Sequence, residues 1–538
     1  MDVSAQPPES PSAETSSLPE PEPGKPTRTS VTVAKNSFWL LIDNVAGLFA
    51  SLYCSTLVAR AMGPERMGDY NYVLYFAFIL KMLTDVAIPQ TFRKFAAEFM
   101  GRQEYSTLKT MVRVVLQLQI KLMIVGVGTG LLIVHFFFRP ATQSLALLAV
   151  LTLVPGLLLS VPAGVLYGTE NLRHNVLGSV TAMAVNLTGV TISVRMGWGL
   201  HAIVASMLAS RVADCILRWL LYYQQTHHLP GKAQDQLDPA LRTRLIRFAA
   251  MQLVPTLLYA LLFDRMEILF LKGLSTSSQI SFFSISFTLV QYSLIVPQTL
   301  AASASVTMMV KQGRNPAEAA QLAASATWLT ILFGAPVLFG IASVADPLLR
   351  LLYGTQYVPA IPVLRTLAVF GIGLAASQSA QHLLVAAERQ TFYVGWLLLC
   401  GAIDVAGCFF LVPRFGAVGA VYAKGISQSV AALGFLTFMV TQFRVRLPMD
   451  RVLRLVATSV AMLVAVDYVV RRVTPAMGLV LGIPLGVLIF VLLTRWLRSL
   501  DQGDRDRLRS LNRMVPARLR KVYLGLVSVI VPARPAAS

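Results

Sequence analysis

Apolar segments of about 20 residues follow one another along the whole chain, separated by loops no longer than about 20 residues. Segments this long and this continuously apolar cross a membrane as α-helices, because the strands of a membrane barrel are shorter and alternate in polarity. We therefore predict an all-α polytopic membrane protein with about fourteen spans and no folded domain between them. The expected spans are 37–59, 71–98, 110–137, 142–167, 176–195, 199–223, 245–271, 279–310, 318–345, 358–386, 391–412, 417–443, 453–470 and 475–497.

The composition agrees with a membrane protein. Only 13% of the residues are charged and the mean hydropathy is +0.63, whereas a soluble domain has about 25% charged residues. The net charge of +20 does not indicate a nucleic-acid partner, because the basic residues lie mainly in short loops between apolar spans. Their distribution predicts a bacterial inner-membrane protein with both termini in the cytoplasm.

The order of the spans divides the chain into two lobes of six spans, two further spans and polar tails. The first tail is rich in Pro, Ser and Glu and is expected to be disordered, and the last is basic and includes a candidate interfacial helix. The expected divisions are a cytoplasmic tail at 1–35, a first lobe at 36–224, a cytoplasmic linker at 225–244, a second lobe at 245–443, two further spans at 444–498 and a cytoplasmic tail at 499–538.

An internal repeat relates the two lobes. The tripeptide Pro-Gln-Thr at 89–91 returns at 297–299, an offset of 208, and Gly189 matches Gly407 at an offset of 218. Because each copy has an even number of spans, the two copies are parallel and are related by an axis along the membrane normal. Transporters built from such repeats bind their cargo between the halves.

Five blocks of sequence carry a resemblance to a known family. They are VARAMGPERMGDYNYVL, LTDVAIPQTFRKFAAEF, FDRMEILFLKGLSTSSQISFFSISFTLV, LLRLLYGTQYVPAIPVLRTL and PRFGAVGAVYAKGIS. Over about residues 36–498 the chain resembles the polysaccharide-transport flippases of the multidrug/oligosaccharidyl-lipid/polysaccharide exporter superfamily.

The resemblance implies a V-shaped, MATE-like bundle that works by alternating access. It implies that the cargo is a polyprenyl-pyrophosphate-linked oligosaccharide, moved from the cytoplasmic to the periplasmic leaflet for the synthesis of O-antigen, capsule or exopolysaccharide. The expected partners are this lipid-linked substrate, membrane lipid and H⁺ or Na⁺ as a coupling ion. The long N-terminal and basic C-terminal tails depart from the family pattern and are candidate binding segments for a polysaccharide polymerase or copolymerase.

Ionisable residues within the spans are the candidate functional residues, because a charged side chain at membrane depth faces a cavity or a partner. A pyrophosphate headgroup requires cationic ligands, and a coupling ion requires a carboxylate. The cationic candidates are Arg265 and Lys424 first, followed by Lys81, Arg365 and Arg211. The coupling-ion candidates are Asp43, Asp85 and Asp264, and the candidate hinges are Pro89 and Pro297.

Some of these charges have a purely structural alternative. Lys81 with Asp85, and Asp214 with Arg218, are spaced four residues apart, so each pair can form an ion pair on one helix face. The sequence leaves the choice between a structural pair and a cavity ligand open.

Two other functions fit the sequence less well than a flippase does. A multidrug or cation antiporter of the same superfamily needs a cavity dominated by carboxylates and aromatic rings, whereas this chain has several basic residues within its spans. A membrane glycan polymerase generally needs a sizeable external loop, and no loop here is long enough. The chain has no G-x-x-x-x-G-K-[ST] motif and no metal-ligand spacing of its cysteines, so we expect no enzymatic activity, cofactor or metal site.

Overall fold

In the computed structural model of the chain, all regular secondary structure among the described residues is helical, and they include no strand. Ten of its helices are long and apolar enough to cross a membrane, or eleven if one bent pair is a single span. The predicted all-α polytopic fold class is therefore confirmed. The described residues are 28–85, 88–168, 172–260, 264–497, 499–510 and a few positions from 512 to 528.

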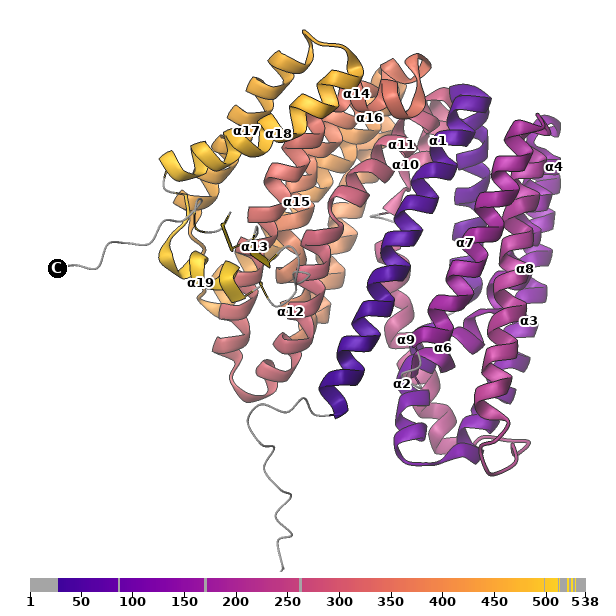
Figure 1. Ribbon diagram of the computed structural model, residues 1–538. Coiled ribbons are helices and arrows are strands. Elements are labelled where there is room, and N and C mark those ends of the chain that lie inside the picture. Colours follow the sequence, from indigo (N-terminus) through magenta and orange to yellow (C-terminus); the bar gives the residue numbers. More distant parts are fainter. Residues whose placement is uncertain are drawn as a thin grey trace, which may run out of the picture.

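The first half of the chain forms one bundle, whose helices are drawn from indigo to magenta in Figure 1. Its long helices are interrupted at several points, so the expected spans appear as more and shorter elements. They are α1 (Arg28–Asp85), α2 (Ile88–Gly101), α3 (Tyr105–Phe137), α4 (Pro140–Leu151), α5 (Leu153–Leu158), α6 (Ser160–Gly168), α7 (Leu172–Arg195) and α8 (Gly199–Thr226).

The second half forms a second bundle beside the first, and α17 and α18 pack on its outer side (Figure 1). The elements of this half are α9 (Pro239–Tyr259), which begins against α2 of the first bundle, and then α10 (Glu267–Leu274), α11 (Ser277–Ser293), α12 (Ile295–Arg314), α13 (Pro316–Ser343), α14 (Ala345–Tyr353), η2 (Thr355–Ala360), α15 (Ile361–Ala386), α16 (Gln390–Phe443), α17 (Met449–Val470), α18 (Pro475–Trp496) and α19 (Gln502–Ser510).

Two of the helices are hairpins, which accounts for part of the difference between the expected and the observed number of spans. The part of α1 from Ile42 to Asp85 has 44 residues and α16 has 54, about twice the length that one crossing needs. Each has a residue with non-helical dihedral angles, Gly63 (φ 76°, ψ 172°) in α1 and Gly416 (φ 57°, ψ −130°) in α16. Positive φ is accessible to glycine because it lacks a Cβ atom.

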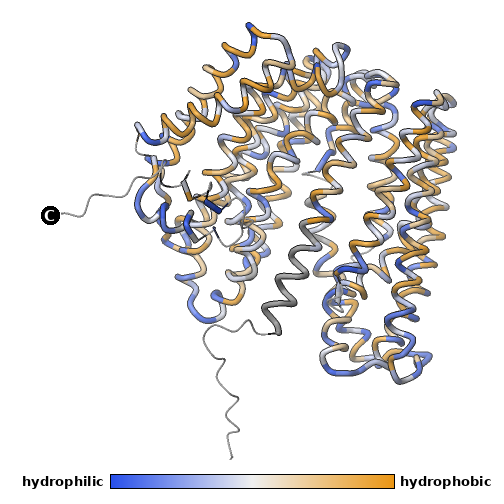
Figure 2. Tube along the Cα trace, in the orientation of Figure 1, coloured by the Kyte–Doolittle hydropathy of each residue, from blue (hydrophilic) through white to orange (hydrophobic). Residues whose placement is uncertain are grey.

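Apolar and polar residues occupy different parts of the helices. Apolar residues cover the middle of the helices and polar residues gather at their two ends (Figure 2). The tails fall largely outside this description. The helix α1 begins at Arg28, within the segment 1–35 predicted as a tail, and residues 1–27 and most of the predicted interfacial helix lie outside the described residues.

The two lobes share a close helix approach at repeat-related positions. A Cβ atom on Gly189 would lie 2.7 Å from the Cβ atom of Ser206, and one on Gly407 would lie 2.9 Å from that of Ala423. The glycines are 218 residues apart and their partners 217 apart, so the predicted duplication has a structural counterpart. Small residues let helix backbones approach closely within a membrane.

Candidate functional site

The candidate site lies where three long helical paths are broken. The path of α1 and α2 is interrupted after Asp85, and α2 begins at Ile88 with Pro89 in its first turn. The path of α11 and α12 is interrupted at Leu294, with Pro297 in the first turn of α12, and bends by 54°. Both breaks lie next to the prolines predicted as hinges, and their role in motion stays a prediction.

The third break separates α9 from α10, and its two sides are fixed to different lobes. The start of α9 is held against α2, because Arg244 donates to both carboxylate oxygens of Glu98 at 2.9 and 3.0 Å and the Lys94 ammonium lies 4.1 Å from the centre of the Phe248 ring. The start of α10 is held in the second lobe through Glu267. The residues between them therefore lie where one lobe passes to the other.

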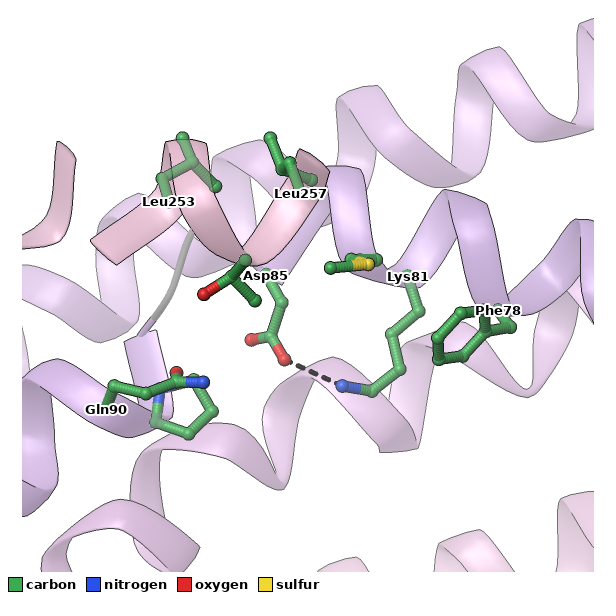
Figure 3. Close-up of a pocket in the computed structure, with 9 residues that line it drawn as sticks. Phe78, Lys81, Asp85, Gln90, Leu253 and Leu257 are labelled. Atoms are coloured by element: carbon green, nitrogen blue, oxygen red, sulfur yellow. Dashed lines mark hydrogen bonds and ion pairs between the residues drawn. The ribbon is translucent and has the colours of Figure 1, made fainter. Parts of the chain in front are cut away.

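A pocket of about 210 Å³ opens between the break after Asp85 and α9. Figure 3 shows Lys81 and Asp85 extending toward each other within it, with Leu253 and Leu257 of α9 on the opposite wall. The Lys81 Nζ atom lies 2.7 Å from Asp85 Oδ2, so the predicted pair on one helix face is present. The Lys81 side chain is 40% exposed, and the pair can therefore meet a ligand that enters the pocket.

Arg265 lies at the break between α9 and α10 and is half-buried. Its Nη2 atom donates to Thr288 Oγ1 at 3.3 Å, and its guanidinium lies 4.9 Å from the centre of the Phe287 ring. Among the residues that the structure describes, no carboxylate forms a hydrogen-bonded ion pair with Arg265. Tyr75 interacts electrostatically with Asp264 and Arg265, and its ring stacks on that of Phe78 in the pocket wall, with 6.4 Å between the ring centres.

Lys424, the other leading candidate, is engaged by the protein itself. Its Nζ atom lies 2.8 Å from Glu267 Oε1, and the two side chains are only 1% and 0% exposed. Asp404, on the other arm of the α16 hairpin, is also buried and interacts with both. The predicted role of Lys424 in binding a headgroup is not tested by these contacts, but its ammonium is directed toward Glu267.

A second buried charge cluster lies in the first lobe, between α7 and α8. Arg218 donates to Asp214 at 2.6 Å and to Ser179 at 2.8 Å, and it also donates to Asn175. Asp43 of α1 interacts with this cluster through Ser179 and Arg218, and its side chain is partly exposed although its Oδ1 atom is buried without a hydrogen-bond partner among the described residues. The predicted pair of Asp214 with Arg218 is thus present within a larger hydrogen-bonded group.

Arg365 and Arg211 lie away from the breaks. Arg365 forms an ion pair with Asp467 on α17, and Asp467 also pairs with Arg471 at 2.7 Å. Arg211 is exposed on α8 and lies outside the cluster of Asp214 and Arg218. The structure therefore places Arg365 on the outer side of the second lobe, and the proposed binding roles of both residues stay predictions.

One end of the bundle is sealed by contacts between the lobes, and we call this group the Gly63 seal. Arg60 donates to the carbonyl oxygen of Leu352 at 2.8 Å, and Tyr357 donates to that of Ala59 at 3.2 Å. Asp69 accepts from Lys272 at 2.9 Å and from Ser277 at 2.7 Å. A Cβ atom on Gly68 would lie 1.7 Å from the carbonyl oxygen of Ser277, so the two lobes touch through their backbones here.

The sequence identified the charged residues within the spans but did not show which of them form pairs. Glu267 and Asp404 were visible as carboxyl groups within spans, but Glu267 and Lys424 are 157 positions apart in sequence, so no local spacing connects them. Asp467 was visible in the same way and lies 102 positions from Arg365. The available signal was only that an acidic and a basic residue inside spans must each find a partner.

Comparisons with solved structures agree on the fold. The lipid II flippase MurJ in an inward closed conformation matches with a TM-score of 0.67 and 14% identity, over 86% of this chain and 98% of that chain. A multidrug resistance MATE family transporter in an inward-facing conformation matches with a TM-score of 0.64 and 15% identity, over 76% and 98%. A MOP superfamily transporter from Pyrococcus furiosus gives 0.56 and 15%, over 77% and 95%.

The family comparison covers just over half of the chain. No curated protein sequence matches. The model of the polysaccharide biosynthesis protein family matches residues 33–313 of the 538. This range contains the first lobe, the break between α9 and α10, and the bent pair α11 and α12. The resemblance drawn from the sequence blocks is confirmed, and the chain belongs to the polysaccharide biosynthesis protein family, with the two-lobed fold found in MurJ and the MATE transporters.

Proposed function

We propose that this protein flips a polyprenyl-pyrophosphate-linked oligosaccharide from the cytoplasmic to the periplasmic leaflet of a bacterial inner membrane, for the synthesis of a surface polysaccharide. The observation that carries the proposal is Arg265, a half-buried guanidinium at the break between the lobes whose one hydrogen bond among the described residues is to a hydroxyl. A planar guanidinium with unused donors suits a diphosphate, because it binds two oxygens at once.

The pocket lined by Lys81 and Asp85, which Phe78 and Tyr75 connect to this guanidinium, supplies the remaining requirements of such a cargo. Its walls are mainly apolar, with Phe78, Met82 and Leu257 beside Lys81 and Asp85. Apolar walls suit the first units of a prenyl chain, whereas Lys81 and Asp85 offer polar groups to the diphosphate and the first sugar. Lys81 is then a second cationic ligand, exchanging part of its contact with Asp85 for the cargo.

The direction of access follows from the Gly63 seal. With the N-terminus in the cytoplasm, the Gly63 end of the bundle is the periplasmic end, so the described conformation is closed toward the periplasm. Opening toward the periplasm requires the contacts of Arg60, Asp69 and Tyr357 to break together. We propose Pro89 and Pro297 as the hinges, because each lies in the first turn after a break in its helical path.

The test is lipid analysis in cells depleted of the protein and complemented with variants. Arg265→Gln is expected to lower flipping at least about tenfold, because the loss of charge-assisted hydrogen bonds costs about 1.5 to 3 kcal/mol. The undecaprenyl-linked repeat unit should then accumulate on the cytoplasmic leaflet, and one surface polysaccharide should be lost. Arg195→Gln, the same change of charge on the exposed end of α7, is the matched control and should complement fully.

The same experiment separates this proposal from its alternative. Normal pools of lipid-linked sugars and an unchanged cell surface in the depleted cells, together with increased sensitivity to cationic drugs, would replace the flippase by a cation antiporter. Full complementation by Arg265→Gln, with depletion still causing accumulation, would keep the flippase but remove Arg265 from its binding site. Protein levels in the membrane fraction, measured for every variant, exclude a loss of expression as the cause.

A further inference from the structure

The feature that carries a further inference is the buried triad of Glu267, Asp404 and Lys424, which joins α10 to both arms of the α16 hairpin. Each of the three side chains is at most 1% exposed. Lys424 Nζ bonds Glu267 Oε1 at 2.8 Å, and the Cys408 thiol donates to Asp404 Oδ1 at 3.6 Å. The second carboxylate oxygen of Glu267, Oε2, is buried and lacks any hydrogen-bond partner among the described residues.

The charges of this triad do not balance. Two carboxylates surround one ammonium, so with all three groups ionised a net negative charge is buried in the membrane, at a cost that proteins avoid by protonation. The carboxyl groups of Glu267 and Asp404 lie within hydrogen-bonding reach of each other. Two ionised carboxylates have no donor between them, whereas a proton on either one supplies the donor that the unpartnered oxygen lacks.

The surrounding groups do not remove this imbalance. Asp264 interacts with Lys424 and adds a third carboxylate, and Arg265 adds a second cation. Tyr75 of α1 faces Glu267, and Cys408 lies beside Asp404, but both are neutral in their usual form. The group therefore has three carboxylates and two cations, and one added proton makes it neutral.

We propose that the triad of Glu267, Asp404 and Lys424 is a proton-binding site that couples protonation to cargo binding. In the protonated state, an O–H group shared between Glu267 and Asp404 closes the hydrogen-bonded group, and Arg265 stays available to an anionic cargo. When the proton leaves to water, the triad gains a negative charge, which attracts the neighbouring Arg265 guanidinium. The coupling to cargo rests on the proposed function, whereas proton binding does not.

Arg265 is close enough to respond. It and Lys424 lie against the same Phe287 ring, at 4.9 and 5.3 Å from the ring centre. Glu267 is the first residue of α10 and follows Arg265 by two positions, directly after the break. A sodium ion is a poorer occupant of this site than a proton, because the Lys424 ammonium already bonds Glu267 there and repels a second cation.

Infrared spectroscopy of the full-length protein in detergent tests the proposal with no need for the cargo. The spectrum should contain a protonated carboxylic-acid band that disappears as the pH is raised. Asp404→Asn and Glu267→Gln each remove one negative charge, as one proton does, and each should abolish the contribution of the triad to that titrating band while the protein stays folded. Asp346→Asn, which removes the carboxylate of the balanced pair with Arg350, is the matched control and should keep the band.

A third variant moves the signal in the opposite direction. Lys424→Met leaves two carboxylates with no ammonium, so the protonated band should grow and persist to higher pH. If this variant does not fold, the two amide variants still decide. A titrating band that is unchanged in both amide variants, or no such band in the wild type, would overturn the proposal. The lipid analysis is independent, so its failure would remove the cargo and leave the proton site standing.

Discussion

The two lobes each bury a cation among carboxyl groups, and the surroundings of that cation differ. In the first lobe, Arg218 has three hydrogen-bonding partners on α7 and α8, and its second carboxylate, Asp43, is only half-buried. In the second lobe, Lys424 and both of its carboxylates are almost completely buried. The Asp43 side chain keeps some exposure although its Oδ1 atom is buried without a hydrogen-bond partner among the described residues, whereas all three side chains of the second-lobe triad are buried. Under the proposal above, burial, more than charge count, separates the structural cluster of the first lobe from the titrating triad of the second.

The largest expected effect is that of Lys424→Met. Removal of the ammonium leaves Glu267 and Asp404 buried with no cation, which should destabilise the folded protein by about 3 to 5 kcal/mol. Thermal unfolding in detergent measures this effect. The double variant Lys424→Met/Glu267→Gln should regain most of the lost stability, and if it does not, charge imbalance is not the cause.

A smaller loss is expected for Arg218→Met in the first lobe. Asp214 would lose its charged partner, but the second carboxylate of this cluster, Asp43, is less buried than Glu267 and Asp404, so we expect a loss of about 2 to 3 kcal/mol. The same thermal unfolding assay compares it with Lys424→Met. A loss larger than that of Lys424→Met would reverse the ranking of the two lobes. Asp214→Asn in the same background is the control that should restore stability.

A smaller effect still is expected when Asp43, the second carboxylate of the first lobe, is removed. Asp43→Asn is expected to change stability by about 1 kcal/mol or less and to leave the titrating infrared band of the second lobe intact, because the Asp43 side chain is partly exposed whereas the triad is buried. Asp404→Asn in parallel should abolish that band. Loss of the band in Asp43→Asn as well would show that the two clusters titrate as one.

The smallest effect is expected at a third cluster, outside the spans, where α19 meets the second lobe. Arg451 bonds Asp501 at 2.6 Å and Asp504 at 3.2 Å, and Asp504 also accepts from Trp328 at 2.8 Å. Burial raises the pKa of Asp504 above its ordinary value, with Asp501 adding to the rise. The folded protein therefore holds this proton more tightly than the unfolded chain, so the contribution of Asp504 to docking is present at low pH and is lost as the pH rises through the raised pKa.

Hydrogen exchange corrected for the intrinsic rate measures this docking. The protection of α19 should decrease as the pH rises above the ordinary range of an aspartate, and Asp504→Asn should remove this pH dependence. A pH dependence equal in both proteins would assign the effect to another group. Because Asp501 is about half exposed, the change should be smaller than any predicted for the second lobe.

The sequence was sufficient for the fold because hydropathy and span length constrain a membrane chain strongly. It was sufficient for the pairs Lys81–Asp85 and Asp214–Arg218 because a spacing of four residues places both side chains on one helix face. It could not connect Lys424 to Glu267, since their contact depends on how α10 packs against α16. The turns at Gly63 and Gly416 lie at the ends of expected spans, whereas the break between α9 and α10 lies within the expected span 245–271 and depends on backbone geometry that hydropathy does not record.

The contact of Gly68 with Ser277 has a consequence for ion leakage. Where side chains close a path, a change of rotamer can open it slightly, so that small ions pass. Here two backbones are in direct contact, and a Cβ atom on Gly68 would already overlap the carbonyl oxygen of Ser277. Such a closure has no intermediate position, because packed backbones are either in contact or separated. Under the proposed function, this contact keeps ions out of the cargo path for as long as the lobes remain together at this end.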